Sequence, residues 1–164
     1  MADQIELENS QTIVDGNGVI NLPTGKISLH TLRQVLNLLP FEIDFANADD
    51  ELVYYSAVDN RVNARSQNSL GKPFVSLFAE ADQEAVQNML TDFHNGAASH
   101  FEQWFPKNDK TVYANYYSVR DIDGTFLGTL QFTGDITRIQ GFRGIRTAFN
   151  SGKSDKQFTN LPLC

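Results

Sequence analysis

The residues that could do chemistry in this chain are 3 histidines, 1 cysteine and 20 acidic side chains. Haem would need an axial ligand, for which neutral imidazole is the usual choice, and His94 is the best placed candidate. A histidine just before Asn95 and Gly96, which should end a helix, more commonly contacts the terminal carbonyl groups. His30 and His100 lack partners at the spacing of metal ligands, so we expect both on the surface.

Cys164 is the only cysteine, so no disulfide can form within the chain and no cysteine-based metal site is expected. This cysteine usage favours a reducing, cytoplasmic location. The segments Asp15–Gly18 and Asp121–Gly124 look like the starts of calcium loops. Both lack the glutamate that closes such a loop, so we interpret them as turns and predict no metal site.

Glu42 and Asp44 are the carboxylates whose spacing could suit acid–base catalysis, which needs two carboxyl groups with separated pKa values. They alternate with apolar residues, and we expect them on the outer, solvated face of a sheet. We therefore predict no catalytic residues. The alternative is a small α+β enzyme that uses a central cavity for acid–base chemistry, with Tyr116 or His94 as the proton carrier.

The net charge of −7 should repel a phosphate backbone, so the composition argues against nucleic-acid binding. Residues 136–164 are nevertheless basic, with five Lys or Arg and one acidic residue. If this tail bound nucleic acid, deletion of residues 138–164 would abolish binding, and salt would weaken it steeply. No apolar run approaches the roughly 20 residues of a membrane span, and no basic and apolar leader opens the chain, so no membrane partner is expected.

Two segments have helical periodicity. The first lies between Ser28, which can cap a helix, and Pro40, which ends it. Its apolar residues at helical spacing are Leu29, Leu32, Val35, Leu36 and Leu39. The second runs from a capping Asp82 to Asn95, with an apolar stripe along one side.

Five further segments have β character: residues 41–45, 52–55, 100–105, 111–120 and 125–133. Turn residues separate them as hairpins, which predicts an α+β fold with a five-stranded antiparallel sheet, helices on one side and a leading N-terminal helix. In the last segment Phe126, Leu130 and Phe132 share an apolar face, whereas Thr129, Gln131 and Thr133 share a mixed one. We expect the apolar face to be buried and the mixed face to be half exposed.

The order of these elements and the closing segment resemble a PAS domain, whose last strand typically ends in Asp-Ile-Thr, here Asp135-Ile136-Thr137. Residues 20–25, 36–43 and 102–104 are similar to the PAS module that follows hemerythrin-like domains in many bacterial proteins. The resemblance spans residues 20–140. It implies a sensory or interaction module and not an enzyme, and it divides the chain into a flexible arm (1–27), a PAS-like domain (28–137) and a basic tail (138–164).

The chain departs from that group at Gly71–Glu80, where the hemerythrin-linked proteins commonly read Asn-Cys-His-Pro-Pro. Any metal or redox role of that motif is therefore not carried over. Cys164 lies in the tail and cannot be the adduct-forming cysteine of a flavin photosensor of the PAS group. Haem and noncovalent flavin remain as cofactor alternatives, and neither is predicted.

Aromatic and apolar residues from several elements could converge on a cavity of the kind that PAS domains have between sheet and helices. A small apolar ligand would bind there; the simpler interpretation, which we favour, is that the side chains fill each other's space. The candidates are Phe45, Tyr54, Phe74, Phe78, Met89, Phe93, Trp104, Tyr116 and Phe132.

The resemblance also implies how a signal would pass. PAS modules often dimerise through a leading helix, so Leu29, Leu32 and Leu36 are candidates for a homodimer contact. The Asp135-Ile136-Thr137 segment would be the junction to a downstream signalling protein that the sequence does not identify. Gly141 and Gly144 disfavour a long rigid helix after this junction, because each glycine costs about 1 kcal/mol relative to alanine.

Overall fold

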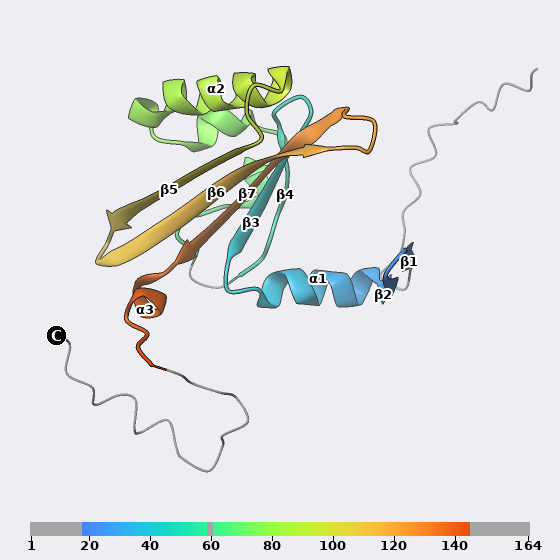
Figure 1. Cartoon of the computed structure of the whole chain (residues 1–164), viewed down its shortest axis with the longest axis horizontal. Coiled ribbons are helices and arrows are strands. Elements are labelled where there is room, and N and C mark those ends of the chain that lie inside the picture. Colours follow the sequence, from blue (N-terminus) through green and yellow to red (C-terminus); the bar gives the residue numbers. More distant parts are fainter. Residues whose placement is uncertain (1–17, 59–60, 145–164) are drawn as a thin grey trace, which may run out of the picture.

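The computed structural model describes residues 18–58 and 61–144. Its centre is an antiparallel sheet of five strands in the order β4-β3-β7-β6-β5 (Figure 1). The strands are β3 (Glu42–Asn47), β4 (Leu52–Tyr55), β5 (His100–Lys107), β6 (Lys110–Arg120) and β7 (Phe126–Asp135). The predicted α+β class and five-stranded antiparallel sheet are confirmed.

The helix α2 (Glu80–Asn95) and the short helices η1 (Gln67–Ser69) and η2 (Phe74–Leu77) follow β4, and α2 and η2 pack on one face of the sheet, which we call the inner face. The buried residues of α2 join Phe74 and Tyr116 in the apolar core. α2 starts two residues before the predicted cap: Asp82 lies in its first turn, where the helix dipole favours a negative charge. The helix ends as predicted at Gly96, whose φ of 71° lies in the left-handed region.

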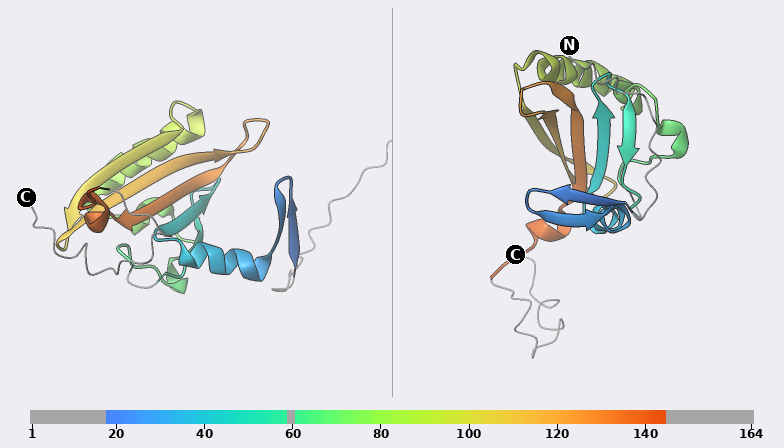
Figure 2. Two further views of the ribbon diagram at one scale, coloured as in Figure 1. Left: turned by 60° about the horizontal axis from the view of Figure 1, so that its bottom comes forward. Right: turned by 90° about the vertical axis from the view of Figure 1, so that its right-hand side faces the viewer.

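The leading helix α1 (Leu29–Leu38) forms as predicted, and the Ser28 side chain caps it by accepting a hydrogen bond of 3.0 Å from the Thr31 amide. α1 leads away from the sheet (Figure 2). An unpredicted hairpin precedes α1, formed by β1 (Val19–Leu22) and β2 (Gly25–Ser28), mostly within the segment predicted to be a flexible arm. The remainder of that arm, residues 1–17, lies outside the described residues, as does the tail from residue 145.

Two turns and the end of one helix set the lengths of the later elements. Asn108 and Asp109 have φ values of 50° and 59°, which makes a two-residue hairpin turn and lengthens β5 and β6 beyond the prediction. Asp121–Gly124 is a turn, as predicted, in which the Gly124 amide donates to the Asp121 carbonyl oxygen at 3.0 Å. After β7 the helix α3 (Thr137–Gln140) stops at Gly141.

The two faces of the sheet are opposite to the prediction. Thr129, Gln131 and Thr133 are buried on the inner face, whereas Leu130 and Phe132 are only half-buried on the outer face. The predicted alternation of β7 holds from Gly128 to Thr133, but alternation alone does not say which face the helices cover. Phe126 does not share a face with Leu130 and Phe132 as predicted: it packs against the inner core, beyond an irregularity in the β6–β7 register. The polar side chains can lie on the covered face because they find hydrogen-bond partners in distant segments of the chain.

Candidate functional site

The inner face of the sheet carries a group of buried polar side chains at the end where β3 begins and β7 ends. Glu42 lies opposite Thr133, and Asp44 lies opposite Gln131, in the register of the two central strands. All four are at most 5% exposed. Burying two carboxylates in neighbouring positions is costly unless cations and hydrogen-bond donors are supplied.

The segment 61–66, which follows β4, supplies those donors. Asp44 accepts hydrogen bonds from Arg61 Nη2 at 2.5 Å and from Arg65 Nε at 3.1 Å, and Arg65 Nη2 lies 3.0 Å from its second oxygen. The Glu42 carboxylate accepts from the amides of Val62 and Asn63. Two carboxylates thus face two guanidinium groups, which neutralises the buried charge and fixes segment 61–66 to the sheet.

This network corrects the prediction that Glu42 and Asp44 lie on a solvated outer face. They alternate with apolar residues as expected, but they point to the covered side of the sheet. Their cationic partners lie 17 or more residues further along the chain, in a segment without a clear sequence period. Two arginines close together in such a segment, near two alternating acids, were the available signal.

Gln131 extends the polar group toward the apolar core. Its Nε2 donates to Thr133 Oγ1 at 3.0 Å and lies 3.5 Å from the Tyr116 hydroxyl, which also accepts from Gln103 at 3.2 Å. Burial raises the pKa of Tyr116, so its phenol stays protonated near neutral pH. A protonated, buried phenol is a poor general base, and this geometry gives the enzyme alternative no support at Tyr116.

His94, the other proton carrier or haem ligand considered, lies at the end of α2. Its Nε2 is 3.0 Å from Asp50 Oδ2, and its ring packs on Phe126 with centroids 4.4 Å apart. His94 therefore ties α2 to the β3–β4 turn instead of contacting the helix-terminal carbonyls. His30 and His100 are exposed, as predicted, with His100 stacked on Tyr117. Within the described residues no three His, Cys, Asp or Glu side chains gather into a metal site.

The structure divides the nine aromatic and apolar pocket candidates between the two faces. Five of them meet in the core between α2, η2 and β6: Phe74, Phe78, Met89, Phe93 and Tyr116. The other four lie on the outer face: Phe45, Tyr54, Trp104 and Phe132. The nine residues therefore do not line one common space.

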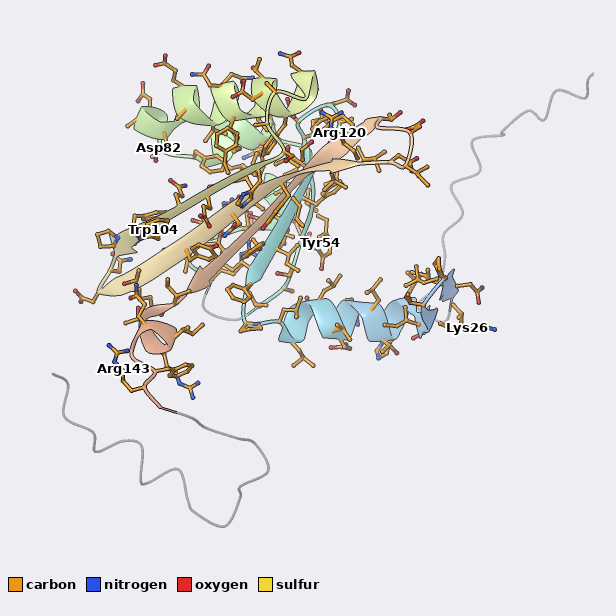
Figure 3. All side chains as sticks on the ribbon, viewed as in Figure 1. Lys26, Tyr54, Asp82, Trp104, Arg120 and Arg143 are labelled. Atoms are coloured by element: carbon orange, nitrogen blue, oxygen red, sulfur yellow. The ribbon has the colours of Figure 1, made fainter. Side chains whose placement is uncertain are left out.

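The outer face is an aromatic surface. Phe132 lies at its centre, with ring centroids 5.4 Å from Phe41, 6.2 Å from Tyr113 and 6.0 Å from Tyr117. Trp104 projects from β5 and is 65% exposed (Figure 3). Aromatic side chains from β5, β6 and β7 thus lie on the sheet face that α2 and η2 do not cover.

The predicted dimer-contact residues Leu29, Leu32 and Leu36 are half-buried on α1, a helix in which no residue is buried. At the other end of the domain the junction residues are held to the sheet. Asp135 Oδ1 accepts from the Thr137 amide at 2.9 Å and from its hydroxyl at 2.6 Å, and the hydroxyl oxygen accepts from the Thr111 amide at 2.8 Å. The Thr137 hydrogen bonds lower the pKa of Asp135.

Comparisons with known proteins agree on the class of this fold. The chain is similar to the C-terminal domain of a protein from Streptococcus mutans, with 27% identity, coverage of 77% of this chain and 98% of the other, and a TM-score of 0.71. It is similar in fold to a PAS domain from Colwellia psychrerythraea, with 14% identity, coverage of 67% and 98%, and a TM-score of 0.51. It is also similar in fold to the PAS domain of BvgS from Bordetella pertussis, with 15% identity, coverage of 66% of this chain and 86% of the other, and a TM-score of 0.50. None of the curated proteins matches the chain.

A sheet of this topology with α2 and η2 on its inner face defines a PAS fold. The family model described as "PAS domain" matches residues 32–137, and the chain belongs to that family. The predicted resemblance to PAS domains is thus confirmed, and the family is typical of sensory modules. Among the described helices, none has the length and apolar character needed to cross a membrane.

Proposed function

We propose that this chain is a sensory or protein-interaction module of a bacterial cytoplasm and that it acts as a homodimer, in which α1 of each copy packs on the outer sheet face of the other. The observation that carries the proposal is that two apolar surfaces of the chain, α1 and the outer face, are left uncovered by its described residues. Packing one of these surfaces on the other would cover both.

The helix α1 has an apolar side, as a helix packed in a core does, but none of its residues is buried. Leu29, Leu32 and Leu36 lie on its apolar side, and Leu38 is 81% exposed. Because α1 points away from its own sheet, it cannot cover that sheet without a change of direction at Leu39 and Pro40 (Figure 2). A second copy provides the surface directly.

The outer face provides an apolar counterpart for such a helix. Trp104, Tyr117 and Phe132 supply aromatic surface from three strands, and aromatic side chains are enriched at the centres of protein interfaces. A reciprocal exchange gives each copy one helix and one sheet face in contact, which closes as a two-fold dimer. The exchange buries both surfaces at once.

The same proposal assigns output to the Asp135-Ile136-Thr137 junction, through an unidentified downstream protein. Its hydrogen bonds to Thr111 couple the start of α3 to β6, and β6 contributes to the outer face. The context of a hemerythrin-linked module and the binding of an apolar ligand between sheet and helices remain predictions. The filled core around Phe74, Phe93 and Tyr116 favours an interaction module over an apolar ligand sensor.

The test compares native masses by light scattering. We expect two chains for the wild type and one for a variant that combines Leu32→Asp and Leu36→Asp, because both charges would enter the apolar contact. Ile122→Asp is the control: it places one such charge on a fully exposed apolar residue in the β6–β7 turn and should leave the mass of two chains. A double variant that stays dimeric would contradict the proposal.

A further inference from the structure

A cleft of about 180 Å³ lies at the end of the sheet where β3 begins and β7 ends. The connection from α1 to β3 forms one wall through Leu39 and Phe41, and Val58 and Val62 form another. The Phe41 ring also lies against Gly134, where an added Cβ would come within 2.4 Å of the ring. None of the nine pocket candidates from the sequence lines this cleft.

A second hollow of about 90 Å³ adjoins the cleft and shares Val62 and Lys110 with it. Arg61, Lys107 and Lys110 line this hollow, and no carboxylate does. A concentration of positive charge is unexpected in a protein with a net charge of −7. The hollow therefore has the electrostatic character of an anion site.

The three cations differ in how far their charge is compensated. Arg61 is engaged by Asp44 inside the fold. Lys110 Nζ lies 3.7 Å from Asp135 Oδ2, a long ion pair at a surface position. Lys107 Nζ donates to two neutral oxygens, Val62 O at 3.1 Å and the Asn63 side chain at 3.5 Å, and has no carboxylate within 4.0 Å among the described residues.

Two carboxylates, Glu42 and Asp135, also line the larger cleft. The amides of Val62 and Asn63 bind the Glu42 carboxylate, and Arg61 lies 3.6 Å from it. Asp135 uses one oxygen for Thr137 and has Lys110 near the other. Because both acids are compensated, the uncompensated charge of the combined site is that of Lys107.

We propose that the two hollows together bind a small aliphatic monocarboxylate, with its carboxylate between Lys107 and Lys110 and its apolar chain against Phe41, Val58 and Val62. Charge-assisted hydrogen bonds to ammonium groups suit a carboxylate. The apolar walls favour a hydrocarbon chain over inorganic phosphate. The volume is below the roughly 300–1,000 Å³ of sites for drug-sized ligands, so the chain is short.

Ligand binding at this site would affect the hydrogen bonds of the Asp135-Ile136-Thr137 junction, a consequence that rests on the proposed sensory function. A ligand carboxylate at Lys110 competes with Asp135 for the same ammonium group. Asp135 also orients Thr137, whose hydroxyl oxygen accepts from the Thr111 amide. The site lies beside the end of α1 as well, so occupancy would act on both segments that leave the sheet.

The test uses hexanoate as the probe and follows amide chemical shifts of the full chain by NMR. We expect saturable shifts at Phe41, Lys107, Lys110 and Gly134, with weaker binding of hexanol, which lacks the charge, and of acetate, which lacks the chain. Lys107→Gln should weaken hexanoate binding at least about tenfold, the loss of one charge-assisted contact. Lys72→Gln removes an exposed lysine outside both hollows and should change nothing.

Equal binding of hexanol and hexanoate, the absence of saturable shifts at millimolar hexanoate, or full affinity in Lys107→Gln would each overturn the proposed site. The amide spectrum of each variant reports whether it is folded, and Lys107→Met is a second neutral variant. Native mass is recorded on the same samples. A dimer that fails to bind hexanoate overturns the site alone, and a monomer that binds it overturns the proposed dimer alone.

Discussion

At the end of the sheet where β3 begins and β7 ends, the two faces reverse the usual distribution of polarity. The inner face buries Asp44, Gln131 and Thr133, whereas the outer face leaves Trp104 and Phe132 at least partly in contact with solvent. This polar end of the inner face is covered by segment 61–66, which supplies specific partners to Glu42 and Asp44. The outer face is apolar but lacks a covering layer in the described chain, and the proposed dimer would supply that layer.

The largest effect is expected from Asp44→Asn. The substitution leaves the buried Arg61 and Arg65 without their shared carboxylate, and breaking a buried ion pair from one side costs about 3–5 kcal/mol. Urea unfolding measures this loss. Asp49→Asn, at an exposed position in the next turn, should stay within about 0.5 kcal/mol of the wild type. Similar losses in both variants would show that the inner network does not hold the fold.

Two threonines on the inner face differ in whether their hydroxyl groups are hydrogen-bonded. Thr133→Val should destabilise the fold by about 1–2 kcal/mol, because its hydroxyl oxygen accepts from Gln131 and Asn63. Thr129→Val should be neutral or stabilising by about 1 kcal/mol, because the buried Thr129 hydroxyl has no partner among the described residues. Thermal or urea unfolding of the two variants compares them directly. Equal losses would contradict the assignment of hydrogen bonds.

On the outer face, Trp104→Ala should change association more than folding. Because the side chain is 65% exposed, the free energy of unfolding of the monomer should change by less than about 0.5 kcal/mol. The dimer dissociation constant should rise about tenfold or more, as expected for an aromatic residue in an interface. Sedimentation at several concentrations measures it. A large loss of folding stability, with unchanged association, would assign Trp104 to the core instead.

The smallest effect is expected for Asp135, the last residue of β7. Because Thr137 lowers its pKa from the ordinary 3.8, its contribution to stability is fully present above about pH 4 and is lost as pH falls through the lower, folded-state pKa. In Asp135→Asn the free energy of unfolding should no longer lose this contribution as the pH is lowered, which unfolding curves at a series of pH values measure. A side-chain titration by NMR at or above the ordinary pKa would contradict the direction.

Much of the fold was predictable because local signals are strong where one residue decides a boundary. Ser28, Pro40 and Gly96 set the ends of the two main helices, and the residues Asn108 and Asp109 mark a hairpin turn. The β1–β2 hairpin was missed because its strands are short and its pairs, such as Ile20 with Ile27, have no lasting period.

The candidate site was less predictable because it depends on contacts between distant segments. The alternation of Glu42 and Asp44 was visible, but the choice of face depended on Arg61 and Arg65, which lie in a segment without a period. The aromatic residues similarly predicted apolar surfaces, but the sequence did not show which of them would lie in the core and which on the outer face. Trp104 and Phe74 are equally apolar in sequence, and only the topology places them on opposite sides of the sheet.

The strand order has a mechanical consequence. β3 and β7 are adjacent central strands, with Glu42 at the start of one opposite Thr133 near the end of the other. A tensile load between α1 and α3 would therefore pull on neighbouring strands from the same end of the sheet. It would open the β3–β7 ladder one hydrogen bond at a time, like a zip, instead of shearing all of them together. The first pairs to part would be those beside Glu42, so force on the flanking segments would act first where the buried charges are held.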